Sequence, residues 1–452
     1  MKNRLFTKGI PPIRILPMGY LFVILIGTAL LMLPASSTGA PMPFFDAFFT
    51  ATSASCVTGL VVADTGTYFT RFGQAVILLL IQVGGLGFMV VTSMLFMALR
   101  RRVSIRDRML LAEGTGSGRL QGVMLLSRRM LELTFFCELL GAVLLSCSFV
   151  PAYGPGKGIW FAVFHSVSAF CNAGFDLIGG YRSLVPFADD PLVNFTIMAL
   201  IIIGGLGFAV VLEVASRWKK KGRLSVHTRV VLTMAALLIF CGAVFFWLFE
   251  SNNPATLGGL SIPRQAMRAL FQSVTCRTAG FNTIDQAAMG GAAKLLSCLL
   301  MFIGGAPAGT AGGVKVTTIA LLFFAVRSLT RGREEPEALG RRFSRNALAR
   351  ALCILLLAMS ALFVGAIILS LAEQGTPCGA TNFLNQFFEL VSALGTVGLS
   401  TGISVQAGTI TRLVLCALMY LGRAGLLTIA LAFGHEDEES AIRYPKGEMM
   451  IG

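Results

Sequence analysis

Residues 386–402 read QFFELVSALGTVGLSTG, a short apolar stretch followed by a turn of small residues that contains a central glycine. Three similar stretches lie earlier in the chain: FFDAFFTATSASCVTGL at 44–60, FAVFHSVSAFCNAGFDL at 161–177 and ALFQSVTCRTAGFNTID at 269–285. Each is long enough for a short helix but too short to cross a bilayer, which is typical of a re-entrant segment. We therefore interpret the chain as four internal repeats, each built around one such stretch.

The four stretches share a glycine and, in three copies, a serine six residues before it. The glycines are Gly59, Gly174, Gly280 and Gly398; the serines are Ser53, Ser168 and Ser392, and the third copy has Val274 instead. A single stretch of this kind is typical of small-residue packing between membrane helices. Four in register favour a shared role at one centre.

Composition indicates that lipid is the main solvent of this chain. Of the 452 residues, 55% are hydrophobic and 13% are charged, and the mean hydropathy is +0.77. Soluble domains carry about 25% charged residues. Apolar runs near or above the roughly 20 residues that a spanning helix requires flank the four stretches. They are 16–34, 75–99, 131–150, 192–215, 230–249, 294–326, 351–371 and 413–433. The first run is interpreted as a retained helix, because seven more follow it, and not as a cleaved signal.

The formal net charge of +15 is explained by topology. Basic residues gather at 2–14, 100–129, 217–229, 327–350 and 443–446, which fall on alternate sides of the apolar runs. This is the pattern of cytoplasmic loops, so both termini are predicted to be cytoplasmic and no nucleic acid is needed to explain the charge.

The predicted fold is an all-α integral membrane protein of four covalently linked span–pore-loop–span units around a pseudo-four-fold pore. It would contain eight transmembrane helices and four re-entrant pore helices. The predicted units are 11–104, 122–218, 226–330 and 346–434, followed by a cytoplasmic tail at 435–452.

The turn before each shared glycine is the candidate ion-binding segment. Rings of backbone carbonyls can replace the water shell of a potassium ion, and glycine permits the backbone conformations that aim carbonyls inward. The C-terminal end of each pore helix would also favour a cation. The predicted filter residues, whose carbonyls would be the only metal ligands, are Cys56, Val57, Thr58, Gly59, Cys171, Asn172, Ala173, Gly174, Arg277, Thr278, Ala279, Gly280, Gly395, Thr396, Val397 and Gly398.

The second apolar run of the third unit contains GGAPAGTAGGVK at 304–315, whose glycines and proline make a continuous helix improbable. This predicts an intramembrane loop below the filter, suited to a gate. Lys315 and Arg423 are intramembrane charges; they would form an electrostatic barrier or hold the loop closed, and snorkelling or carbonyl capping is the alternative. The candidate gate residues are Gly304, Gly305, Ala306, Pro307, Ala308, Gly309, Thr310, Ala311, Gly312, Gly313, Lys315 and Arg423.

Other polar residues carry weaker expectations. Arg277 is expected to brace the third turn against a carboxylate, and Asp46 and Asn385 are candidate caps of their pore helices. Glu138 and Glu213 would either line the ion pathway or bond neighbouring helices. The ten cysteines lack a CxxC pair and the three histidines lack metal-ligand spacing, so neither a metal centre nor an enzyme is predicted.

The motifs VTGL, NAGF, TAGF and TVGL, together with GGAPAGTAGGVKVTT and GRAGLLT, resemble the Trk/Ktr/HKT superfamily of potassium transporters. The resemblance covers the whole chain to RYPKGE at 443–448 and is strongest to the bacterial KtrB-type membrane subunits. It implies a channel-like potassium uptake subunit of the bacterial cytoplasmic membrane, with Na+-dependent uptake. Plant relatives with serine at the first filter glycine carry sodium, so Gly59 favours potassium.

The resemblance also implies partners. Such subunits form homodimers, each protomer with its own pore, on a cytosolic octameric ring of KtrA, an RCK-type regulator that binds ATP or ADP. No cofactor is expected on this chain itself. The arginine-rich loops and HEDEES at 435–440 are the candidate ring and dimer contacts.

There are two alternative functions. The first is sodium conduction, for which the plant examples carry serine at the position of Gly59. An alternating-access cation symporter is built from inverted repeats, whereas the four repeats here all begin on the cytoplasmic side.

Overall fold

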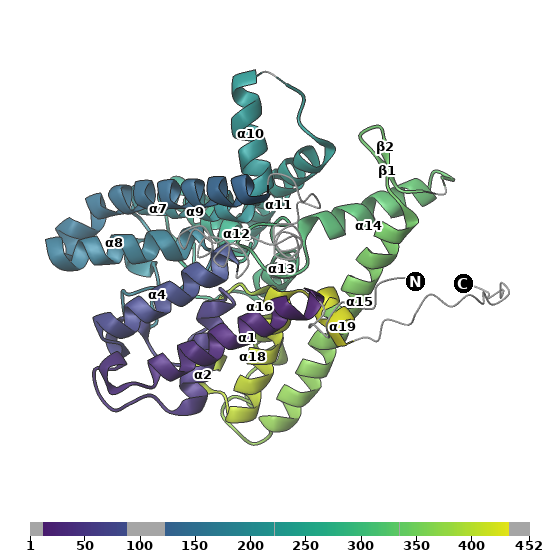
Figure 1. Cartoon of the computed structure of the whole chain (residues 1–452). Helices are drawn as coiled ribbons and strands as arrows, with labels where there is room; N and C mark the ends of the chain where they lie inside the picture. Colours follow the sequence, from purple (N-terminus) through teal and green to yellow (C-terminus); the bar gives the residue numbers. More distant parts are fainter. Residues whose placement is uncertain (1–11, 88–122, 221, 334, 434–452) are drawn as a thin grey trace, which may run out of the picture.

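The computed structural model describes residues 12–87, 123–220, 222–333 and 335–433 (Figure 1). Within these ranges the elements are helices, apart from a small hairpin of β1 (Glu337–Ala338) and β2 (Arg341–Arg342). The end of the first predicted unit, the basic segment 100–119 and the tail at 435–452 lie outside the described residues.

Each predicted repeat contributes a long first helix, a short helix before the shared glycine and a second helix after it. The first helices are α1 (Pro12–Leu31), α7 (Val123–Tyr153), α11 (Val226–Glu250) and α15 (Arg345–Ala372). The short helices are α2 (Phe44–Ser55), α8 (Pro155–Phe170), α12 (Ile262–Thr275) and α16 (Phe383–Gly395). The second helices begin with α4 (Arg71–Leu86), α9 (Pro191–Gly205), α13 (Gly291–Phe302) and α18 (Thr409–Ala424).

Shorter elements complete the described chain. The helices α10 (Phe208–Lys220), α14 (Val316–Leu329) and α19 (Leu426–Phe433) follow α9, α13 and α18. Single turns form α3 (Thr65–Tyr68), α17 (Ile403–Gln406), η1 (Pro34–Ser36) and η2 (Val185–Phe187).

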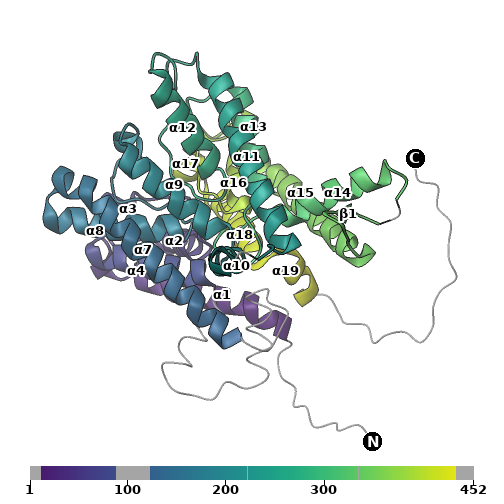
Figure 2. The same ribbon diagram turned by 90° about the horizontal axis from the view of Figure 1, so that it is seen from above.

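The repeats pack in a closed cycle. The second helix of each repeat contacts the short helix of the next: α4 on α8, α9 on α12, α13 on α16, and α18 on α2. The last of these pairs joins the fourth repeat to the first. Figures 1 and 2 show the purple, blue, teal and yellow-green parts of the chain around one centre. This packing supports the predicted pseudo-four-fold arrangement.

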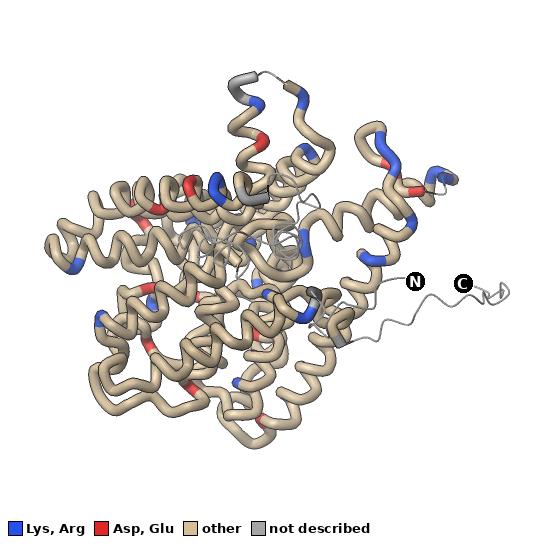
Figure 3. The backbone as a smooth tube through the Cα atoms, in the orientation of Figure 1, with Lys and Arg blue, Asp and Glu red and all other residues tan. Residues whose placement is uncertain are grey.

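Burial follows that arrangement. Each short helix places a phenylalanine without exposed surface in the core, at Phe49, Phe164, Phe271 and Phe388, and α8 adds Phe170. The first helices instead carry large apolar side chains on their outer faces, among them Phe22 at 62%, Leu139 at 67% and Phe240 at 70% exposure. Apolar faces of this extent fit contact with lipid. In Figure 3, Lys and Arg gather around the β1–β2 hairpin, at the edge of the molecule.

Eight transmembrane helices were predicted, with the one at 294–326 interrupted, and the described residues contain fewer long spans than that. Four helices, α1, α7, α11 and α15, are long and apolar enough to cross a membrane, and two bent pairs raise the number to six. The remaining apolar helices, α4, α13 and α14, are shorter.

The second helices are shortened by glycine. The axes of α9 and α10 differ by 100° and those of α18 and α19 by 94°. Gly87 after α4, Gly207 before α10 and Gly425 before α19 have φ of 84°, 85° and 92°, a region that glycine enters at little cost. Breaks therefore occur in the second and fourth units as well as in the third unit, where the sequence predicted one.

Candidate ion pathway

The four glycine turns (56–59, 171–174, 277–280 and 395–398) share one backbone conformation. The residue two before each glycine has a left-handed φ: 56° at Val57, 59° at Asn172, 68° at Thr278 and 50° at Thr396. The glycines follow with φ of 94°, 70°, 82° and 90°. A positive φ is rare for a β-branched residue such as valine or threonine, and strain of this kind concentrates at functional sites. Four diverged sequences therefore adopt the same uncommon shape.

The shared glycines form a closed ring in chain order. A Cβ built on Gly59 would lie 2.4 Å from the Ala173 oxygen, and one on Gly174 would lie 2.8 Å from the Ala279 oxygen. The next two distances are 2.5 Å, from Gly280 to the Val397 oxygen, and 2.0 Å, from Gly398 to the Thr58 oxygen. Each glycine thus lies against the carbonyl that precedes the next glycine. The ring leaves no room for a side chain.

A hydroxyl group from each short helix secures each turn. Ser53 Oγ accepts a hydrogen bond from Gly59 N and Ser392 Oγ accepts one from Gly398 N, both at 3.1 Å. Ser168 Oγ donates to Phe175 O at 2.8 Å. The third repeat, which lacks the aligned serine, uses Thr275 Oγ1 on Phe281 O at 2.5 Å. Alignment missed Thr275 because it lies five residues before the glycine and not six.

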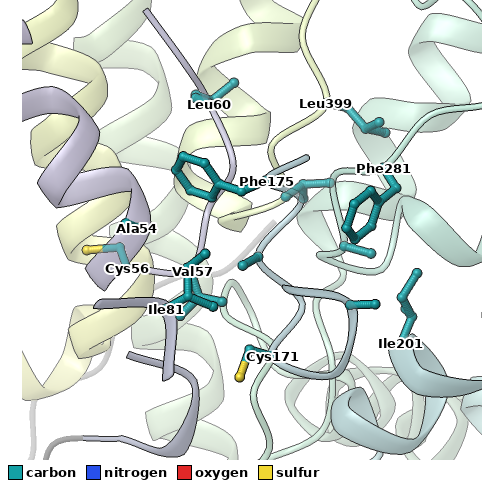
Figure 4. Packing of buried hydrophobic residues seen from close by; sticks show 14 of the residues in the cluster. Ala54, Cys56, Val57, Leu60, Ile81, Cys171, Phe175, Ile201, Phe281 and Leu399 are labelled. Atoms are coloured by element: carbon teal, nitrogen blue, oxygen red, sulfur yellow. The ribbon is translucent and has the colours of Figure 1, made fainter. Parts of the chain in front are cut away.

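The residues after the glycines pack behind the turns. Leu60, Phe175, Phe281 and Leu399 are each at most 1% exposed. Figure 4 shows them beyond the turns, with Cys171 at the opposite end of the view. Within the described residues, no cluster of three or more His, Cys, Asp and Glu side chains is placed to hold a metal ion. The candidate cation ligands stay the backbone carbonyls of the four turns, which lie at the ring of shared glycines.

The loop 304–315 is closed at its base and docks on the second repeat. Gly304 N donates to Val314 O at 2.8 Å and Val316 N to Gly305 O at 3.1 Å. On the second repeat, the acceptors of the loop are the last carbonyls of α9. Ala306 N donates to Gly205 O at 2.9 Å and Thr310 N to Gly204 O at 3.2 Å. The loop therefore docks at the break between α9 and α10.

The loop also reaches the beginning of two glycine turns. Thr310 Oγ1 donates to the Phe170 oxygen at 3.2 Å, at the end of α8. A Cβ built on Gly312 would lie 2.1 Å from Thr396 Oγ1. The loop therefore lies against the helix-side ends of the second and fourth turns, in agreement with a position below them.

Arg423 and Lys315 both bond to carbonyls around this loop. Arg423 Nη1 donates to Thr310 O, and Nη2 donates to Gly84 O and, at 3.2 Å, to Gly85 O. Lys315 Nζ donates to Ala311 O at 2.6 Å. Arg423 thus joins the end of α18 to the loop of the third repeat and to the end of α4. The contacts are those of the carbonyl-capping alternative, and a gating role stays a prediction.

Arg277 of the third turn bonds to a different kind of partner from the carboxylate that was expected. Arg277 is 7% exposed, and its Nη1 donates to the Ala235 carbonyl of α11 at 3.1 Å. A backbone carbonyl therefore accepts where a carboxylate was expected.

The expected caps of two short helices were wrong. Pro43 precedes α2, while Asp46 lies in its first turn and pairs with Arg412. Asn382 caps α16, its Oδ1 accepting from Leu384 N at 3.0 Å. Asn385 instead accepts from Lys294 Nζ at 2.9 Å.

Glu138 and Glu213 bond neighbouring helices. Gln82 Nε2 of α4 donates to Glu138 Oε2 of α7 at 3.2 Å. Ser225 Oγ, which caps α11, donates to Glu213 Oε2 of α10 at 2.7 Å. These contacts match the helix-bonding alternative for both residues.

The sequence and the fold match known transport proteins. The family described as "TrkH: Cation transport protein" matches residues 14–443. The chain is 38% identical to Ktr system potassium uptake protein B of Bacillus subtilis, over 99% of this chain and 98% of that protein. It is 37% identical to potassium/sodium uptake protein NtpJ of Enterococcus hirae, over 100% of this chain and 99% of that protein.

The structure has the fold of a solved transporter. It is similar to the potassium transporter TrkH from Vibrio parahaemolyticus, with a TM-score of 0.74 and 18% sequence identity. The match covers 96% of this chain and 87% of that one.

Proposed function

Because the chain belongs to the TrkH family of cation transport proteins, we propose that it is a channel-like potassium uptake subunit of the bacterial cytoplasmic membrane. The observation that carries this proposal is the closed ring of glycine turns, in which each glycine lies against the next repeat's carbonyl. The names of relatives at 38% and 37% identity, with potassium or potassium and sodium in them, support the choice of ion.

The glycine turns act as the selectivity filter in this proposal. A potassium ion exchanges its water shell for carbonyls of the four turns, and the C-terminal ends of α2, α8, α12 and α16 add a favourable field for a cation. The hydroxyls of Ser53, Ser168, Thr275 and Ser392 hold the four turns through hydrogen bonds to the backbone at or directly after each shared glycine.

The loop 304–315 acts as the gate below this filter. It is held by Arg423 on the Thr310 carbonyl and by its own hydrogen bonds to the end of α9. Once these contacts are released, a glycine-rich segment exchanges conformations at low cost. Opening requires release of the Arg423 contacts, and the charges of Arg423 and Lys315 oppose cation passage while the loop is closed.

Regulation is proposed to come from a cytosolic partner. We infer that the protein is a homodimer on an octameric RCK-type KtrA ring, with ATP or ADP bound to the ring and uptake dependent on Na+. The name of the Bacillus subtilis relative, a Ktr system protein, supports this assignment. Both termini and the basic residues along α10 and near the β1–β2 hairpin would face the cytosol and the ring.

Potassium uptake by cells tests the proposal. The chain is expressed in potassium-starved cells that lack their own uptake systems, with and without the RCK-type partner, at low and at moderate sodium. Uptake that needs the partner and rises with sodium is the expected result. Uptake independent of both would leave the pore and remove the regulation. No potassium uptake by protein confirmed in the membrane would contradict the proposal.

Sodium conduction is the second candidate function. The Enterococcus hirae relative, named for both potassium and sodium uptake, favours it. Sodium influx that exceeds potassium influx in the same cells would establish this candidate in place of the first.

A further inference from the structure

Glu389 is a buried carboxylate beside the fourth glycine turn. It lies on α16, nine residues before Gly398, and has no exposed surface. Its partners come from the segment 400–404, directly beyond the turn. Glu389 Oε1 accepts from Ser400 Oγ at 2.8 Å, from Ser404 N at 3.1 Å and from Ser404 Oγ, and Oε2 accepts from Thr401 N at 3.2 Å. Among the described residues, no Lys or Arg forms a salt bridge with it.

These contacts fix the segment after the turn. An ionised carboxylate only accepts hydrogen bonds, and a buried one is costly unless donors surround it. The four donors of segment 400–404 offset the cost of burying the Glu389 carboxylate. The segment and α16 therefore hold each other in place. The turn at 395–398 is thereby anchored on both sides, by Ser392 on Gly398 N and by Glu389 on the residues that follow.

The other repeats lack this anchor. The positions nine residues before the shared glycine are Thr50, His165 and Phe271. Thr50 Oγ1 donates to Asp46 O, and His165 Nδ1 contacts Phe161 O, both within their own short helices. The side chain of Phe271 has no polar atom and cannot form such a hydrogen bond. The carboxylate anchor is therefore confined to the fourth repeat.

We propose that Glu389 is a positioning residue that sets the ion selectivity of the filter by anchoring the fourth turn through segment 400–404. The proposal rests on the proposed function, because it concerns selectivity among cations that the protein conducts. Glu389 does not touch the ion. It acts on the Val397 carbonyl, which lies against Gly280 in the ring.

Glutamine is the sharpest substitution, because it keeps the size and removes one acceptor. The two backbone N–H donors bond to different oxygens of Glu389, Thr401 N to Oε2 and Ser404 N to Oε1. A backbone N–H cannot reverse its role as a hydroxyl can. Whichever way the amide of Glu389→Gln turns, one N–H group faces an NH2 group. Glu389→Asp keeps both acceptors on a shorter side chain and should restore part of the lost selectivity.

Glu250→Gln is the matched control. Glu250 is also buried, at 1% exposure, and accepts from Asn253 Nδ2, Thr256 Oγ1 and Gly290 N. Its contacts join the end of α11 to the start of α13 and do not reach a glycine turn. Both substitutions should lower thermal stability, and only Glu389→Gln should change selectivity.

The experiment compares potassium and sodium flux by full-length protein reconstituted in liposomes together with the RCK-type partner, which the proposed function requires for uptake. We expect the K+/Na+ flux ratio to fall roughly tenfold in Glu389→Gln, the effect of about 1.4 kcal/mol, and to stay unchanged in Glu250→Gln. If wild-type protein conducts potassium and both variants keep its ratio, Glu389 is only structural and the inference is wrong. If Glu389→Gln does not fold, Ser404→Ala removes one donor from the segment, and an unchanged ratio there also overturns it. Wild-type protein without potassium flux would refute the proposed function itself.

Discussion

At the scale of single residues, the ring of shared glycines is the most constrained feature. Gly59 has a φ of 94° and faces the Ala173 carbonyl, so a side chain meets both backbone strain and a clash. The glycine spacing made these positions predictable from sequence. Thr275 and Glu389 were missed, because the first is shifted by one residue and the second occurs in one copy only. Comparison of internal repeats identifies residues that the copies share and cannot identify a residue that occurs in one copy only.

Replacement of Gly59 should weaken the preference for potassium. In Gly59→Ser the new Cβ displaces the Ala173 carbonyl, which changes one side of the ring, and we expect the K+/Na+ flux ratio to fall by about tenfold or more. Flux into liposomes measures it. Gly39→Ala is the control, since Gly39 has open space around it and no positive φ. An unchanged ratio in Gly59→Ser would remove the first turn from the filter.

Replacement of Arg423 should loosen the gate. Arg423→Ala removes the donors to the Thr310 and Gly84 carbonyls, so the loop loses a contact that we assign to its closed position. Potassium flux without the cytosolic partner should rise severalfold, with the K+/Na+ ratio retained. Arg128→Ala is a suitable control, because that side chain is 71% exposed. A fall in flux would show that Arg423 supports the conducting form.

At the scale of elements, breaks at glycine shorten the second helices. Two of these helices, α13 and α18, are preceded by a glycine whose N–H group donates to a glutamate. Glu250 accepts from Gly290 N before α13, and Glu373 accepts from Gly408 N before α18. The glycine clusters were visible in the sequence, but their left-handed φ was not, because glycine is equally compatible with a continuous helix and with a break. The roles of Glu250 and Glu373 could not be predicted from the sequence, since glutamate is common at helix ends.

Glu373 should contribute stability that depends on pH. Burial raises the pKa of this carboxyl group, but hydrogen bonds from Thr376, Thr411 and Gly408 N and the charge of Arg412 lower the pKa overall. A lowered pKa in the folded state means that the stabilisation is complete above the ordinary pKa of 4.5 and is lost as the pH falls through the folded value. At pH 7, Glu373→Gln should unfold with a free energy about 1–3 kcal/mol lower than wild type.

Thermal unfolding in detergent at pH 7 and near pH 4 measures the difference in stability between wild type and Glu373→Gln. This difference should be smaller at the lower pH. The K+/Na+ flux ratio should stay at the wild-type value, because Glu373 accepts its hydrogen bonds from Thr376, Gly408 and Thr411 and none from a glycine turn. A difference in stability that grows on acidification would contradict the assignment.

At the scale of the whole molecule, four diverged repeats close one ring. The four-fold relation was predictable, because the glycine turns recur between apolar runs. The number of straight spans was not, because composition records how much apolar chain is present and not where it bends. The ring also differs from one made of identical strands, since its turns share little besides glycine. We therefore expect softer discrimination against rubidium and sodium than in a symmetric potassium channel.

A cross-link between repeats should separate a channel from a rocking transporter. Lys294 of α13 and Asn385 of α16 are in contact across the third and fourth repeats. With cysteines at both positions and the exposed Cys147 and Cys353 replaced by serine, a short thiol cross-linker should leave potassium flux intact, because a channel moves its gate and not its repeats. Flux that stops on cross-linking and returns on cleavage of the linker would favour alternating access.

The contact between α18 and α2 has a consequence for biosynthesis. It joins the last repeat to the first, so the ring cannot close until the ribosome has made nearly the whole chain. At 5–20 residues per second, roughly 20 to 70 seconds separate the synthesis of these two helices. Until α18 is made, the nascent polypeptide lacks the α18–α2 contact and the ring of repeats stays open on one side. A premature stop before α18 would therefore yield an open-sided fragment for quality control to remove.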